Sequence, residues 1–224
     1  MPNSRRRLAT LLVLAAGSLF CVALVLLRNL HTGNPNFRYL IWNLFLAWIP
    51  FALAVFVYDR WRRRRGGALL VTLGALWLLF FPNAPYIATD FVHLRHDALA
   101  PFWYDAVTIA AFAWMGILLG FASLYLMQTV VRQWLGVAAG WTFAVVAIAL
   151  GSLGIYLGRF LRLNSWDALE HPSVIPRMLH TAARDPFAYQ DAIAVTLLFT
   201  FALTFAYFLL YTVAAMSLEL ESER

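Results

Sequence analysis

The stretch Phe81–His96 carries the densest group of side chains that could do chemistry. It reads FPNAPYIATDFVHLRH and directly follows an apolar run. If residues from Tyr86 onward are helical, the side chains of Tyr86, Asp90, His93 and Asp97 share one face, because they are spaced four, seven and eleven positions from the first. An Asp and a His three residues apart on one face can share a metal ion or form an acid–base pair.

A structural interpretation of the same stretch competes with this one. Asp90 could cap a helix while His93 and His96 lie in a hydrated loop. Polar residues beside a membrane-length apolar segment are often functional, because burying them in lipid is costly. Both interpretations stay open at this level.

Two further groups of polar residues follow the fifth apolar run. Arg159 and Arg162 could bind a phosphate, a lipid headgroup or a carboxylate, or they could extend to the membrane interface. Asn164 and Asp167 have the spacing of residues that begin a helix. The segment 173–184 has the pattern of an amphipathic helix lying in the outer interface.

The candidate ligand-binding set therefore has six members, whereas catalytic residues and metal ligands are unknown. The set is Asn83, Tyr86, Asp90, His93, Arg159 and Arg162.

The composition indicates that the bilayer is the solvent for most of the chain. Of the 224 residues, 62% are hydrophobic and 12% are charged, whereas soluble domains are about half apolar and a quarter charged. The net charge of +6 comes from Arg alone. In a membrane protein such residues report topology and attraction to anionic headgroups, so we expect no nucleic acid partner. The single cysteine, Cys21, is expected to be a buried thiol.

The hydropathy pattern predicts an all-α, polytopic integral membrane bundle of about six transmembrane helices, with an amphipathic interfacial helix on the outer face. We expect a single membrane domain over residues 1–224, with polar outer-face segments at 82–104 and 158–191. Residues 28–38 are expected to form a loop. The predicted spans are about 8–27, 39–58, 68–81, 105–130, 134–157 and 192–214.

The third predicted span is too short to cross a bilayer alone. Its 14 residues rise about 21 Å as a helix, against a hydrocarbon core of roughly 30 Å. Either the helix continues through Pro82 and Pro85, or residues 68–94 form a re-entrant segment.

The distribution of Arg predicts the orientation of the chain. The densest run, Arg60–Arg65, flanks the second span, and basic residues in short loops favour the cytoplasmic side. We therefore expect a cell (plasma or inner) membrane protein with cytoplasmic N- and C-termini. Gly116 and Gly120, and likewise Gly136 with Gly140 and Gly154 with Gly158, have the spacing that permits close helix contacts within a chain or in self-association.

Sequence motifs for common catalytic and cofactor sites are missing. The chain has no phosphate-binding loop, dinucleotide fingerprint, His-Glu-x-x-His or Gly-x-Ser-x-Gly. We expect no cofactor, and we expect the partners to be the bilayer and a lipid headgroup or small polar ligand.

Four segments resemble those of a bacterial membrane family catalogued as domain of unknown function 1361. They are Asn43–Pro50, Phe80–Tyr86 continued by Thr89-Asp90 and His93-Leu94, Gly154–Phe160, and Asn164–Asp167. The resemblance covers about residues 40–215 and implies a bacterial multi-pass membrane protein. It assigns no catalytic residue.

Three functions fit these observations, and the first is preferred. The chain could be an accessory or ligand-binding protein that uses an outer-face polar pocket. It could be a membrane enzyme acting on lipid-linked or envelope substrates, which would need Asp90 or His93. It could also be a small-solute transporter that uses residues 82–85 as a broken-helix site.

Overall fold

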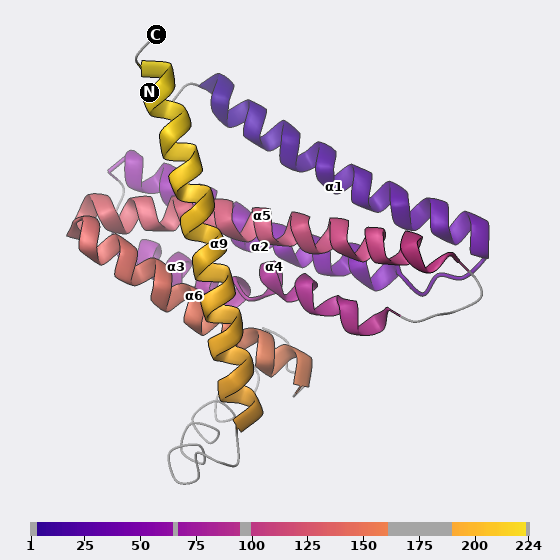
Figure 1. Ribbon diagram of the computed structural model, residues 1–224. Coiled ribbons are helices and arrows are strands. Elements are labelled where there is room, and N and C mark those ends of the chain that lie inside the picture. The colour runs from indigo at the N-terminus through magenta and orange to yellow at the C-terminus, as the bar shows by residue number, and fades with distance from the viewer. Residues whose placement is uncertain (1–3, 65–66, 95–99, 161–189, 223–224) are drawn as a thin grey trace. The chain divides into compact units, whose positions relative to one another are not determined.

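The computed structural model describes residues 4–64, 67–94, 100–160 and 190–222, and these residues are helical or form short connections (Figure 1). The helices are α1 (Ser4–Thr32), α2 (Arg38–Arg62), α3 (Ala68–Phe80), α4 (Asn83–Tyr86), the 3₁₀ helix η1 (Ile87–His93), α5 (Phe102–Leu135), α6 (Val137–Phe160) and α9 (Gln190–Ser222).

Six helical segments among the described residues are long and apolar enough to cross a membrane, which confirms the predicted all-α architecture. Their bounds are Arg7–Thr32, Arg38–Arg62, Ala68–His93, Phe102–Leu135, Val137–Phe160 and Gln190–Met216. The helices extend beyond most of the predicted spans. The prediction of a loop from residue 28 was wrong, because α1 continues through Arg28 to Thr32.

The chain divides into two compact units, unit 1 (Met1–Val130) and unit 2 (Val131–Arg224). The single membrane domain stays a prediction. The predicted interfacial helix lies outside the described residues.

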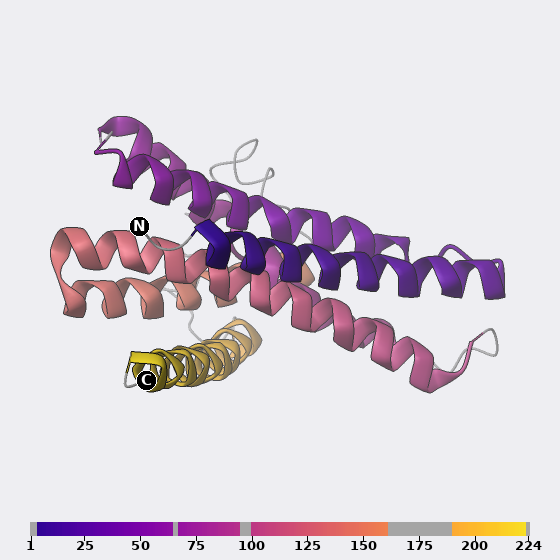
Figure 2. The same cartoon turned by 90° about the horizontal axis from the view of Figure 1, so that it is seen from above.

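Unit 1 is built around α2, whose buried side chains follow the helical repeat. Leu40, Leu44, Ala47 and Phe51 recur at intervals of three and four and are all buried. They form one core cluster with residues from α1 and α5. In Figures 1 and 2, α1 runs along the side of α2 and α5, and α5 runs antiparallel to it.

The third span is one nearly continuous helical segment. Phe81, Pro82 and Ile87 all have right-handed helical backbone angles, so the chain passes from α3 through α4 into η1 without reversing. The prolines supply no N–H, and the Asn83 side chain donates a 3.0 Å hydrogen bond to the carbonyl oxygen of Phe80. The structure thus favours the continuous helix over the re-entrant segment.

This proline-containing turn packs against a glycine pair of α5. A Cβ on Gly116 would collide with the carbonyl oxygen of Ala84, and one on Gly120 would lie 3.2 Å from the Ala84 Cβ. The predicted small-residue pair is therefore an intrachain contact. Gly136, by contrast, lies at positive φ between α5 and α6, so it does not form a helix face with Gly140.

A buried ion pair joins the end of α1 to the start of α5. Arg28 Nε donates to Asp105 Oδ1 at 2.6 Å, and Nη2 donates to Oδ2 at 2.9 Å. The two side chains are 3% and 6% exposed. Asp105 lies in the first turn of α5, where an acidic residue is favourable, and its carboxylate binds the Arg28 guanidinium.

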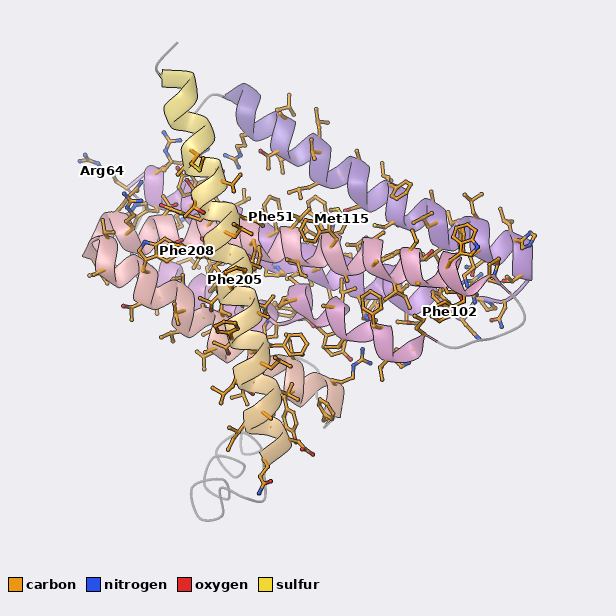
Figure 3. All side chains as sticks on the ribbon, in the orientation of Figure 1. Phe51, Arg64, Phe102, Met115, Phe205 and Phe208 are labelled. Carbon is orange, nitrogen blue, oxygen red and sulfur yellow. The ribbon has the colours of Figure 1, made fainter. Side chains whose placement is uncertain are left out.

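An exposed ion pair lies at the opposite end of unit 1. Arg7 donates two hydrogen bonds to Asp59, of 2.7 and 2.8 Å, and the two side chains are 50% and 33% exposed. We call this the Arg-rich end, because α2 finishes here with several Arg. We call the other end, where Arg28 pairs with Asp105 and where η1 carries Asp90, the Asp90 end. Figure 3 shows Arg64 and Phe102 at these opposite ends.

Unit 2 is held by aromatic packing between α6 and α9. The Trp141 ring lies 4.9 to 6.2 Å from the rings of Tyr207, Phe208 and Tyr211. Arg132 donates a 3.0 Å hydrogen bond to the Tyr211 hydroxyl. Much of α9 remains exposed, including Phe205 and Phe208 (Figure 3), as expected for a lipid-facing helix.

The two ion pairs predict different losses of unfolding free energy when the Arg of each pair is replaced. Arg28→Met leaves the Asp105 carboxylate buried without its partner and is expected to lower the unfolding free energy by about 3–5 kcal/mol. Arg7→Met breaks an exposed pair and is expected to cost at most about 1 kcal/mol. Denaturant unfolding in detergent measures both values.

The double variant Arg28→Met/Asp105→Leu is a control that separates the cost of an unpaired buried charge from the cost of lost packing. It should be more stable than Arg28→Met alone, because no charge remains buried. Equal losses of unfolding free energy for Arg28→Met and Arg7→Met would contradict the claim that the buried pair is more costly to break than the exposed pair.

Candidate functional site

The 3₁₀ geometry of η1 determines which side chains of the third span share a face. A 3₁₀ helix has three residues per turn, so residues i and i+3 lie above one another. Ile87, Asp90 and His93 are therefore aligned, whereas Tyr86 is aligned with Thr89. The predicted stripe, which assumed an α-helix and included Tyr86, was wrong in this respect. The Thr89 hydroxyl donates to the Tyr86 carbonyl oxygen at 2.7 Å.

Asp90 is a buried carboxyl group at the end of a membrane-length segment. Its side chain accepts a 2.9 Å hydrogen bond from Asn43 Nδ2 of α2, and the residue is 1% exposed. The interpretation of Asp90 as a helix cap was wrong, because it lies within η1 and the N-cap residue of η1 is Tyr86. A carboxyl group is costly to bury, and hydrogen bonds such as the one from Asn43 offset that cost.

His93 is the exposed neighbour of Asp90. It is the last residue of η1, and its ring meets the Tyr39 ring edge-on with a 5.3 Å centroid separation. The interpretation that placed His93 in a loop was therefore wrong. His93 lies one 3₁₀ turn beyond Asp90, so an exposed imidazole follows a buried carboxyl group on the same face of η1.

Aromatic contacts connect this pair to the buried ion pair. The rings of Tyr39 and Phe37 are 6.2 Å apart, and the Arg28 guanidinium carbon lies 4.0 Å from the centroid of the Phe37 ring. Hydrogen bonds from the backbone N–H groups of Asn34 and Asn36 to side-chain oxygens shape the loop before Phe37. We call the resulting set the Asp90 layer, comprising Arg28, Phe37, Tyr39, Asn43, Asp90, His93 and Asp105.

The Asp90 layer offers hydrogen-bond acceptors, a hydrogen-bond donor and the imidazole ring of His93. An ionised carboxylate only accepts hydrogen bonds. The Nη1 atom of Arg28 is buried and has no hydrogen-bond partner among the described residues, and buried polar atoms normally have one. No group of three or more His, Cys, Asp or Glu side chains that could hold a metal occurs in the described part of the chain.

The other predicted site residues have different positions. Asn83 uses its amide to close the turn after α3. Arg159 lies in the last turn of α6, in unit 2. Arg162, His96 and Asp97 lie outside the described residues, as do Asn164, Asp167 and the segment 173–184. A ligand site formed by the six predicted residues stays a prediction.

Sequence reasoning missed the contributions of α1 and α2. Asn43 is a single amide in an otherwise apolar run, and Arg28 is a single charge at the end of another. Isolated polar residues in such runs usually find a partner, and this signal could have indicated both. Their pairing with Asp90 and Asp105 across 47 and 77 positions required the fold.

Comparison with known families identifies the chain. Residues 42–213 match the family model described as protein of unknown function (DUF1361). The comparisons with curated proteins and with solved structures found no match. The match covers most of the sequence and includes α2 with Asn43 and the third span with Asp90. The described residues hold six helical segments suited to crossing a membrane, and the chain belongs to the DUF1361 family of proteins of unknown function.

Proposed function

We propose that this chain is a multi-pass membrane protein that binds a small polar ligand or lipid headgroup at the Asp90 layer. The observation that carries the proposal is the burial of the Asp90 carboxyl group at the end of a membrane span, beside Asn43. Such a group is costly unless it has a function or strong partners. His93, three residues farther along η1, is exposed.

The polar atoms of the layer favour a ligand that carries both charges. Asp90 accepts hydrogen bonds from ammonium or hydroxyl groups, and Arg28 Nη1 is a donor suited to phosphate. A phosphoethanolamine headgroup has both features.

The enzyme and transporter alternatives have less support. An acid–base role for Asp90 and His93 fits their position on one face, but neither is yet tied to a reacting group. A transporter would use residues 82–85 as an unwound site, whereas that turn is helical and packs tightly against Gly116. The binding role therefore stands first.

We further propose that the Arg-rich end faces the cytoplasm of a cell membrane. Arg7 and the Arg residues that end α2 lie at the same end of unit 1, as the contact between Arg7 and Asp59 requires. Basic residues in short loops beside membrane spans are retained on the cytoplasmic side. The Asp90 layer then lies at the outer face, and both termini are cytoplasmic.

The ligand proposal predicts a preference for a headgroup with N–H donors. Native mass spectrometry of the protein should show tighter retention of phosphatidylethanolamine than of phosphatidylcholine, whose ammonium has no N–H. Asp90→Asn should reduce that preference by about tenfold, because a hydrogen bond to a charged group is lost.

Asp191→Asn provides the matched control, because Asp191 is an exposed carboxylate in the first turn of α9. It should retain the preference of the wild type. An unchanged preference in Asp90→Asn would contradict the ligand role of the carboxylate.

The orientation predicts which side of the membrane labels each end. In intact cells a membrane-impermeant maleimide should label Val92→Cys, whereas Arg63→Cys should be labelled only after permeabilisation. Both side chains are exposed. The only native cysteine, Cys21, is buried and should give little background. Labelling of Arg63→Cys in intact cells would reverse the orientation.

A further inference from the structure

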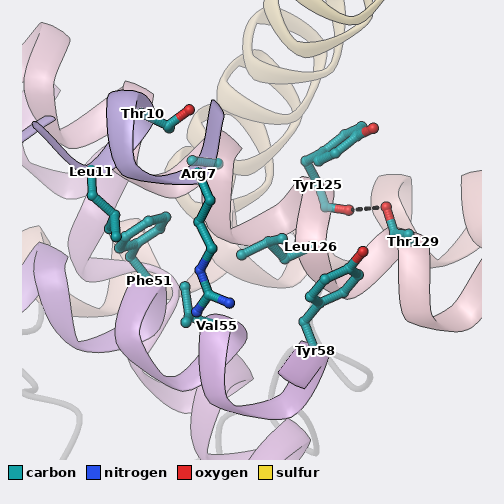
Figure 4. A pocket seen from close by; sticks show the side chains of 10 residues that line it. Arg7, Thr10, Leu11, Phe51, Val55, Tyr58, Tyr125, Leu126 and Thr129 are labelled. Atoms are coloured by element: carbon teal, nitrogen blue, oxygen red, sulfur yellow. Dashed lines mark hydrogen bonds between the residues drawn. The ribbon is translucent and has the colours of Figure 1, made fainter. Parts of the chain in front are cut away.

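A cavity of about 420 Å³ lies within unit 1 at the Arg-rich end, between α1, α2 and α5. This volume is within the roughly 300–1,000 Å³ typical of small-molecule sites. Figure 4 shows the side chains that line it. They are Arg7, Thr10, Leu11, Phe51, Val55, Tyr58, Ala122, Tyr125, Leu126 and Thr129.

The cavity lining has an apolar part and a polar part. Leu11, Phe51, Val55 and Leu126 supply apolar surface from all three helices. Arg7 and Tyr58 add polar groups on the side where α1 begins and α2 ends, and the Arg7 side chain extends along Val55 and Tyr58 (Figure 4). A site of this kind fits an amphiphile, with its apolar chain inside and its polar group at the charged residues.

The charged groups beside the cavity have a net positive charge. Asp59 is engaged in the bidentate pair with Arg7. The guanidinium carbon of Arg62 lies 5.9 Å from the centroid of the Tyr58 ring, which itself lines the cavity. Two guanidinium groups and one carboxylate therefore lie beside the cavity, and guanidinium groups bind phosphate with two parallel hydrogen bonds.

The depth of these groups matches that of a headgroup. Arg7, Asp59 and Arg62 lie at the ends of membrane-length helices, where charged side chains meet the lipid headgroups. The apolar residues lie farther along the same helices, at the depth of acyl chains. A membrane supplies such amphiphiles at high local concentration.

From these observations we propose that the cavity binds one acyl chain of an anionic phospholipid, whose phosphate group contacts Arg7 and Arg62. The site is at the opposite end of unit 1 from the Asp90 layer. It does not depend on the ligand proposed for that layer, and Asp90→Asn should leave it intact.

The test is native mass spectrometry of the full chain with phosphatidylglycerol and phosphatidylcholine of identical acyl chains. The wild type should retain one phosphatidylglycerol in preference to phosphatidylcholine. Arg7→Gln/Asp59→Asn removes the ion pair without leaving a lone carboxylate and should reduce the preference by about tenfold. Arg38→Gln, an exposed change at the other end of α2, should retain it.

A second pair of variants tests the cavity itself. Ala122→Phe places a ring in the cavity and should abolish the tight retention of phosphatidylglycerol. Ala52→Phe adds the same ring on an exposed side of α2 and should not. If Ala122→Phe does not fold, the charge variants still decide the outcome.

Three results would overturn the proposal. Equal retention of the two lipids by the wild type would show that the charge of the headgroup does not determine binding. Undiminished retention by Ala122→Phe would place the lipid elsewhere. A lipid-free dimer that dissociates in Ala122→Phe would make a second copy of the chain the occupant.

Discussion

The backbone of the third span lies so close to Gly116 of α5 that no side chain fits between them. A Cβ at this position would meet the carbonyl oxygen of Ala84. This contact places the turn with Pro82 and Pro85 on a rigid helix, where Asn83 compensates for part of the lost backbone hydrogen bonding. Residues that follow the turn, including Asp90, thereby acquire a defined position next to α2.

The same helices separate two kinds of electrostatic site. At the Asp90 end, Arg28 and Asp105 are nearly inaccessible, so their pair is expensive to break and fixes α1 against α5. At the Arg-rich end, Arg7 and Asp59 remain accessible, so their pair can exchange for other partners at little cost. A buried carboxyl group favours recognition of hydrogen-bond donors, whereas accessible guanidinium groups over an apolar cavity favour anionic lipids.

Much of the fold could be predicted from the sequence, because each apolar run is long enough to require a membrane or a helix partner. The prolines left residues 68–94 open between one continuous helix and a re-entrant segment, because composition does not reveal that Gly116 supports the turn. The stripe of Tyr86 with Asp90 assumed 3.6 residues per turn, but η1 has the tighter 3₁₀ repeat. Asn43 and Arg28 could be recognised as isolated polar residues, but their partners depend on tertiary packing.

The central claim is that close packing at Gly116 holds the third span and hence the Asp90 layer. The most direct test compares the melting temperatures of Gly116→Ala and Gly74→Ala in detergent. Gly74 lies in α3, where an added Cβ meets only Met127 Cε at 3.8 Å. The account predicts that Gly116→Ala lowers stability by about 1–3 kcal/mol through overpacking, whereas Gly74→Ala is neutral or stabilising. Equal melting temperatures for the two variants would contradict it.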